Sequence, residues 1–113
     1  MRLLAGLMGL ALLSACVQPS GPTPASRQAV SFVPDAQGLA VLPSNQRVDF
    51  GRSPKGVIPA LTRELGRPTT LPLTGCPTGI TQRLRWAELE LSFTAERFVG
   101  WKRGADQRGR VCA

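Results

Sequence analysis

The sequence contains no histidine and no tyrosine. Histidine is the side chain that most often acts as a general base near neutral pH, so the commonest form of acid–base catalysis is missing. The chain also lacks a glycine-rich phosphate loop, a nucleophile elbow and a dinucleotide-binding fingerprint. We therefore expect that this protein is not an enzyme and that it has no catalytic residue.

Cysteine is scarce as well, with three residues in the chain. The two cysteines outside the N-terminal region, Cys76 and Cys112, do not form a zinc site without histidine ligands. Residues 75–79 around Cys76 look like a redox loop, but the second nearby cysteine of such a loop is absent. We expect no metal ion and no cofactor other than the covalent acyl groups considered next.

Long apolar runs are absent apart from residues 3–13, which follow the charged Arg2. A membrane-spanning helix needs roughly twenty apolar residues, whereas a shorter run is typical of the core of a signal peptide. The run ends in an apolar residue, two small residues and a cysteine, which match the lipobox of bacterial lipoproteins: Leu13, Ser14, Ala15 and Cys16.

The lipobox predicts that residues 1–15 are a lipoprotein signal peptide and that cleavage leaves Cys16 as the new N-terminus. Leu13 suits an apolar subsite of the protease, and the small Ser14 and Ala15 suit a narrow cleft. Cys16 would receive a diacylglycerol and an N-acyl chain such as palmitate, and two or more chains hold a protein on a membrane stably. The alternative is an ordinary secretory signal that leaves Cys16 as a free thiol.

Residues 16–29 are rich in proline, serine and glycine and are predicted to be a flexible tether. Residues 30–113 suffice for a single small domain, which we expect in the periplasm. Val17 occupies the place where an aspartate usually retains a lipoprotein in the inner membrane. We therefore expect an outer-membrane lipoprotein that faces the periplasm, with the inner membrane as the alternative.

The formal net charge is +7, and arginine supplies nearly all of it. A basic domain can associate with anionic lipid, lipopolysaccharide or acidic protein patches. Nucleic acid is the usual partner of a basic chain, but export makes it an unexpected one here. Because the arginines are scattered singly, a solvated surface without a ligand is the simpler interpretation.

With Cys16 assigned to lipid, Cys76 and Cys112 remain. An even pair of cysteines in an oxidising compartment predicts one disulfide. The chain-entropy estimate for closing so long a loop is about 4 kcal/mol, which is a large share of the stability of a small domain.

A helix is predicted from Ser53, which can cap it, and Pro54, which suits the first helical position. Gly66 suits its C-terminal end. Pro59 argues against a regular helix, so the helix either begins near Pro59 or has a kinked first turn. One apolar stripe at helical spacing is expected in the core: Val57, Ile58, Leu61 and Leu65.

Strand signals are clearest after a turn-rich loop at residues 67–79, where apolar and polar residues alternate and the links are of hairpin length. These three strands are expected at residues 80–86, 89–93 and 98–101. Weaker signals lie at residues 30–32, 39–42 and 47–50. The order predicts an α+β domain, with one short helix packed on a small antiparallel sheet, a three- to four-stranded meander.

Pairing the first two clear strands would place Arg83 and Arg85 opposite Glu88 and Glu90 on the solvent face of the sheet. A return segment at residues 108–111 would then carry Cys112 back to the end of the sheet where Cys76 lies. The predicted meander is therefore compatible with the predicted disulfide.

Short motifs across residues 47–102 resemble small, uncharacterised lipoproteins of alphaproteobacteria and, more distantly, outer-membrane lipoproteins of the SmpA/OmlA type. The motifs are Phe50-Gly51-Arg52-Ser53, Leu65-Gly66-Arg67-Pro68, Leu89-Glu90-Leu91-Ser92-Phe93 and Phe98-Val99-Gly100-Trp101. The resemblance implies a role in envelope assembly or maintenance through protein contacts. Pro59, the Cys76–Cys112 pair and the short C-terminus depart from the distant family's pattern.

Two functions are open at this point. The first is a protein-binding module of the envelope, whose partner contact would include Trp101, Lys102 and Arg103, because an exposed aromatic beside cations is a common hot-spot composition. Trp101 in the core is the equally simple alternative. The second is a basic structural domain on anionic lipid or lipopolysaccharide. The lipid-binding function, unlike the protein-binding function, predicts that five cations form one continuous face. These cations are Arg97, Lys102, Arg103, Arg108 and Arg110.

Overall fold

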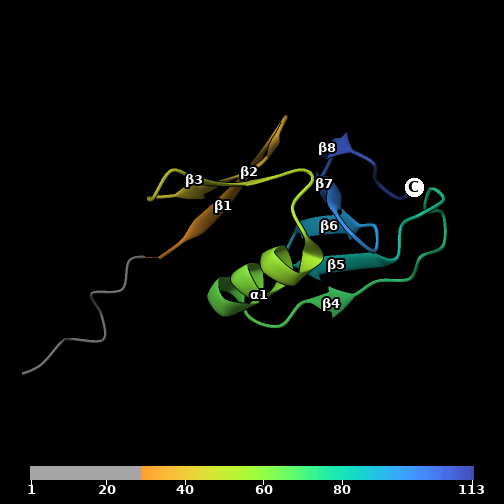
Figure 1. The fold of residues 1–113 in the computed structure, drawn as a ribbon, viewed down its shortest axis with the longest axis horizontal. Coiled ribbons are helices and arrows are strands. Elements are labelled where there is room, and N and C mark those ends of the chain that lie inside the picture. Colours follow the sequence, from red (N-terminus) through yellow and green to blue (C-terminus); the bar gives the residue numbers. More distant parts are fainter. Residues whose placement is uncertain (1–28) are drawn as a thin grey trace, which may run out of the picture.

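The computed structural model describes residues 29–113, which form one helix and two antiparallel sheets (Figure 1). The smaller sheet has the order β1-β2-β3 and the larger β4-β5-β6-β7-β8. The elements are β1 Ser31–Asp35, β2 Gly38–Leu42, β3 Gln46–Asp49, α1 Pro54–Leu65, β4 Thr69–Thr70, β5 Gln82–Trp86, β6 Leu89–Phe93, β7 Phe98–Arg103 and β8 Asp106–Gly109. The α+β class is confirmed, but the predicted three- to four-stranded meander is wrong, because the main sheet has five strands and a second sheet exists.

The five-stranded sheet contains the predicted meander as β5, β6 and β7, and it gains a strand at each edge. On one side Thr69 and Thr70 pair with β5, inside the segment predicted as a loop. On the other side β8 pairs with β7. Both added strands are short and exposed along their length, so they carry none of the alternation by which strands are recognised in a sequence.

The core lies on one face of the five-stranded sheet, under α1 and part of the three-stranded sheet. Phe98 is its centre, with ring centroids 5.0 Å from Phe50 and 5.7 Å from Phe93. Leu39 of β2 is also fully buried and joins the smaller sheet to this core. The other buried members are Val57, Leu61, Leu84, Trp86, Leu89, Leu91 and Trp101.

Helix α1 begins at Pro54 and not near Pro59, so the first of the two alternatives is wrong. The Ser53 hydroxyl caps it as predicted, accepting a hydrogen bond from the backbone N–H of Lys55 at 3.2 Å. Pro59 lies inside the helix without ending it. The carbonyl that it leaves unbonded belongs to the exposed Lys55, so water can take the place of the missing donor. The Trp86 indole donates to the Gly66 carbonyl at 2.9 Å and ties the end of the helix to the sheet.

The apolar stripe of α1 is buried only in part. Val57 and Leu61 are in the core, and Ile58 is partly buried against it. Leu65 is 43% exposed, so its predicted burial is wrong. Leu65 is the last residue of the helix.

The second face of the five-stranded sheet was predicted to meet solvent, but chain segments cover much of it. Arg83 and Glu90 pair there diagonally at 2.8 Å, with side chains only 16% and 10% exposed. Arg85 is the residue directly opposite Glu90 in register. The Pro72 carbonyl also accepts from Arg83 at 3.2 Å, which anchors the loop before the disulfide over this face.

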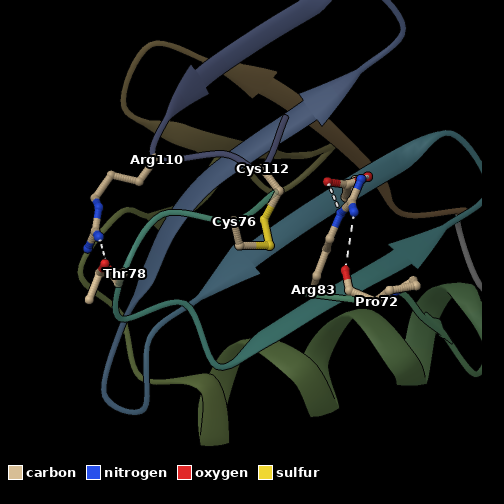
Figure 2. The surroundings of a disulfide bond; sticks show 7 residues. Pro72, Cys76, Thr78, Arg83, Arg110 and Cys112 are labelled. Carbon is tan, nitrogen blue, oxygen red and sulfur yellow. Dashed lines mark hydrogen bonds and ion pairs between the residues drawn. A yellow bond between two sulfur atoms is a disulfide. The ribbon is translucent and has the colours of Figure 1, made fainter. Parts of the chain in front are cut away.

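The disulfide between Cys76 and Cys112 is confirmed, with Cα atoms 4.0 Å apart and a sequence separation of 36 (Figure 2). It joins the loop before β5 to the C-terminal segment, and the Ala113 N–H also donates to the Gly75 carbonyl at 2.9 Å. A Cβ at Gly100 would lie 2.0 Å from the Arg110 carbonyl oxygen, so β7 needs glycine where this segment crosses it.

Candidate functional site

The three-stranded sheet extends over α1 on the side where the chain enters from residue 29 (Figure 1). Its strands pair with the register Phe32 to Val41 and Leu39 to Val48, so these four side chains share one face. We call this the inner face. Leu39 is fully buried at its core end, whereas Phe32 and Val48 are only partly buried.

A cleft of about 570 Å³ separates the inner face from α1. Its walls are mainly apolar: Phe32, Val41 and Val48 on the sheet, and Gly56, Val57 and Ala60 on the helix. The small Gly56 and Ala60 keep the helix wall low, and a Cβ added at Gly56 would meet no heavy atom within 4 Å. Its volume lies within the range of about 300–1,000 Å³ that is usual for small-molecule sites.

Three arginines are among the residues around the cleft, and they differ in their partners. Arg47 lies directly opposite Ala40 in register, so its side chain is on the other face of the sheet, with Asp35 and Asp49. Arg47 makes two hydrogen bonds to the Asp35 carboxylate at 2.7 and 2.8 Å and one to Asp49 at 2.7 Å. Arg63 contacts Glu64 at 3.4 Å. Arg52 forms no ion pair with any residue from 29 to 113. The unneutralised positive charge of the lining is therefore at the Arg52 end.

The ion pairs of Arg47 shift the titration of their groups. The hydrogen bonds from Arg47 hold the pKa of the Asp35 carboxyl below its ordinary value, against a smaller opposing effect of burial. The same carboxylates raise the pKa of Arg47. Both side chains remain about one-third exposed, so solvent screens the pair and its contribution to stability is small.

The opposite face of the three-stranded sheet carries a small apolar surface, which we call the outer patch: Val33, Ala40 and Leu42. Val33 lies directly opposite Ala40 in register, and Leu42 follows two residues later on the same face. Val33 is 38% and Leu42 40% exposed. The strands β1 and β2 therefore present apolar side chains on both faces of the sheet, although the outer face is exposed to solvent.

Asp35 connects this sheet to the core through its backbone. The Trp101 indole N–H donates to the Asp35 carbonyl at 2.8 Å, while the Asp35 side chain binds Arg47. Trp101 is 5% exposed and belongs to the core. Its proposed role as an exposed aromatic contact is therefore wrong, since β7 directs this side chain inward.

The predicted neighbours of Trp101 lie nearer the surface. Lys102 is partly buried and Arg103 is exposed. Because successive side chains of a strand alternate, Lys102 points to the opposite face of the sheet from Arg103. The two cations do not form one contact surface with each other.

The other cations are also dispersed. Arg97 lies in the turn between β6 and β7, at the far end of β7 from Lys102 and Arg103. Arg108 is on the exposed edge strand β8. Arg110 is hydrogen-bonded to the Thr78 carbonyl beside the disulfide (Figure 2). The five cations proposed for a continuous basic face are therefore spread over several surfaces.

The lipobox residues Leu13, Ser14, Ala15 and Cys16 lie outside the residues that the structure describes. Within residues 29–113, no three histidine, cysteine, aspartate or glutamate side chains gather as metal ligands would. In the same range α1 falls short of the length and hydropathy that a membrane crossing requires. Comparison of the chain with protein-family models, curated proteins and solved structures finds no significant match.

The cleft and the outer patch did not emerge from the sequence. The apolar residues of β1 and β2 were visible as short runs, but their alternation was too brief to assign faces. Gly56 and Ala60 were a weak indication of the cleft, because they place two small side chains four residues apart beside the buried Val57.

Proposed function

We propose that this protein is a membrane-anchored envelope lipoprotein that acts as a non-enzymatic protein-binding module. The lipobox at residues 13–16 supports the anchor, and the run of proline, serine and glycine after it supports a tether. The disulfide supports an oxidising compartment such as the periplasm. The resemblance to SmpA/OmlA-type lipoproteins supports a role in envelope assembly or maintenance.

The observation that carries the protein-binding role is the outer patch. An antiparallel sheet with one solvated face normally alternates apolar and polar residues. Here Val33 and Leu42 are exposed apolar residues on the solvated face, beside Ala40 and the ion pairs that Arg47 makes opposite it, while the other face of the same strands lines the cleft and the core. A partner that covers the outer patch would complete the burial that the pattern of β1 and β2 favours.

The alternative role, a basic domain resting on an anionic surface, receives less support. Such binding is strongest when cations lie on one face within a Debye length of the surface. The cations of this domain point in several directions, and Arg47 and Arg83 are already paired with carboxylates. Protein contact through the outer patch therefore explains more of the geometry.

Site-specific photocrosslinking in cells tests the proposal. A photoreactive residue at position 33 or 42 should give one defined protein adduct, and the same residue at Gln107 on the exposed edge strand β8 should not. Adducts of equal yield from all three positions, or none from 33 and 42, would refute the contact.

The anchor is tested separately by mass spectrometry. The mature chain should begin at an acylated Cys16, and Cys16→Ala should abolish the fatty acyl mass. An intact N-terminus without acyl groups would refute the assignment to the envelope. The protein contact through the outer patch would then depend on the crosslinking result alone.

A further inference from the structure

We propose that the cleft between α1 and the three-stranded sheet binds a long-chain fatty acid, with the acyl chain along α1 and the carboxylate paired with Arg52. The inference goes beyond the protein-binding role, because it concerns the inner face of the three-stranded sheet and not the outer patch. It follows from the shape, lining and charge of the cleft.

The shape is that of a trench running the length of the helix. The helix residues that line it extend from Ser53 to Glu64, a distance of about 16 Å at 1.5 Å per residue. Gly56 and Ala60 lie in the middle of this wall, and their small side chains leave space beside the helix. An elongated, unbranched ligand fits such a space better than a compact one.

The lining distinguishes an acyl chain from a peptide. The backbone N–H and C=O groups of a buried extended peptide need hydrogen-bond partners. The walls include five side chains without polar atoms: Phe32, Val41, Val48, Val57 and Ala60. The amide of Gln46 lies opposite Val41 on the edge strand β3. An acyl chain has no polar group along its length, so these walls match it without leaving a donor or acceptor unsatisfied.

The charge places an anionic group at one end. Arg52 is the lining arginine without a carboxylate partner in the described part of the chain, whereas Arg47 and Arg63 each have one. The positive end of the helix dipole lies beside it, and the first turn of α1 contains no acidic residue.

The guanidinium, and not the backbone, would hold this anion. The N–H of Lys55 already donates to the Ser53 hydroxyl, and the N–H groups of Gly56 and Val57 donate to the Ser53 carbonyl. Arginine can donate two parallel N–H groups to a carboxylate. The carboxylate of a fatty acid therefore suits Arg52, and its tail would run along α1 toward Ala60.

Titration of the full chain with palmitate, labelled with ¹³C at the carboxyl carbon, measures the binding. The chain carries Cys16→Ser so that no acyl group of its own competes. We expect saturable binding, and we expect the bound carboxyl to remain ionised at a lower pH than free palmitate, because a guanidinium favours the charged form.

Arg52→Gln should weaken palmitate binding at least about tenfold, since a charge-assisted pair is lost. Lys55→Gln is the matched control, because Lys55 is exposed on the same turn but does not line the cleft. The uncharged hexadecanol should bind the parent chain and the Arg52→Gln chain equally.

Gly56→Leu should abolish binding by filling the trench. Because the added Cβ meets no heavy atom and leucine favours the helix more than glycine, Tm should stay the same or rise. Ala105→Leu, in the exposed turn between β7 and β8, adds the same side chain away from the cleft and should leave binding intact.

Equal palmitate affinity in the Gly56→Leu and Ala105→Leu chains would overturn the proposal, as would an unchanged affinity in Arg52→Gln. Binding to phosphatidylglycerol vesicles without binding of palmitate would also overturn it and assign the cations to a membrane surface. Crosslinking from position 42 does not require palmitate, so this proposal and the protein-binding role can fail independently.

Discussion

The two sheets of this protein are built alike but covered differently. The five-stranded sheet is covered by α1 on one face and by disulfide-linked segments on part of the other, and β6 is buried at all five positions. The three-stranded sheet has the cleft on one face and solvent on the other. The comparison indicates that stability is concentrated in the larger sheet, while the smaller sheet has surface left for binding.

The smaller sheet places one fully buried residue in the core, and Phe32 and Val48 pack against the core while only partly buried. Leu39 enters the core, Trp101 donates to the Asp35 carbonyl, and Arg47 joins Asp35 to Asp49. Elements with few buried contacts open locally at lower free energy than the core, and binding surfaces are often found on them. The predictions below test this difference, beginning with the largest expected effect.

Removal of the disulfide should cost the most. Replacing Cys76 and Cys112 by serine releases the segments that cover the second face of the five-stranded sheet. Chain entropy sets the expected loss at about 4 kcal/mol in the free energy of unfolding. Denaturant titration monitored by tryptophan fluorescence measures it, and a loss below about 1 kcal/mol would show that the covering segments do not depend on the bridge.

Trp101→Phe should destabilise by about 1–3 kcal/mol, because it leaves the Asp35 carbonyl without its buried donor. The loss of stability should be greatest where β1 of the smaller sheet contacts β7 of the larger sheet. Hydrogen exchange should speed up in β1 and β2 more than in β5 and β6. Uniform acceleration across both sheets would contradict the division of stability proposed for them.

Acid should loosen the smaller sheet by a lesser amount. Because the pKa of Asp35 is lowered in the folded state, its pair with Arg47 stabilises the fold above the ordinary carboxyl pKa of about 4. That contribution is lost as the pH falls from about 4 through the lowered pKa. Hydrogen exchange in β1 and β3 at pH 6 and pH 3 measures it.

Asp35→Asn is the control for the acid effect, since it should exchange in β1 and β3 at the same rate at both pH values once the intrinsic pH dependence is corrected. A pH response as large as that of the parent chain would assign the titration to another carboxyl group.

Leu42→Ser should have the smallest effect on stability, within about 0.5 kcal/mol, because the side chain is already 40% exposed. It should nevertheless reduce the yield of the adduct formed from position 33. Leu91→Ala changes a fully buried position of the larger sheet and should lower the free energy of unfolding by about 2–5 kcal/mol. Similar losses in the two variants would remove the distinction between the sheets.

Much of the fold was predictable because its causes are local. The Ser53 cap, Pro54 at the first helical position and the alternation in β5 and β6 each depend on neighbouring residues. β4 and β8 were not predictable, because two and four exposed residues become strands only when a longer strand lies beside them. The helix does not begin near Pro59, because the exposed position of the lost hydrogen bond makes its loss tolerable.

The candidate site was less predictable than the fold. Trp101 was identified as a notable residue, but its sequence neighbours did not reveal that the Asp35 carbonyl, distant in the chain, accepts its indole proton. The cleft arises between α1 and a sheet whose strands were assigned only weakly. Its lining could be recognised only after both walls were in place.

The sequence by itself determined the local elements of this protein: the motif that matches a lipobox, the helix with its cap and the central strands. These depend on residue type and short spacing. Tertiary structure alone decided which faces are covered, which arginine lacks a carboxylate and where the cleft lies, because burial and charge pairing depend on residues that meet across long separations in the chain.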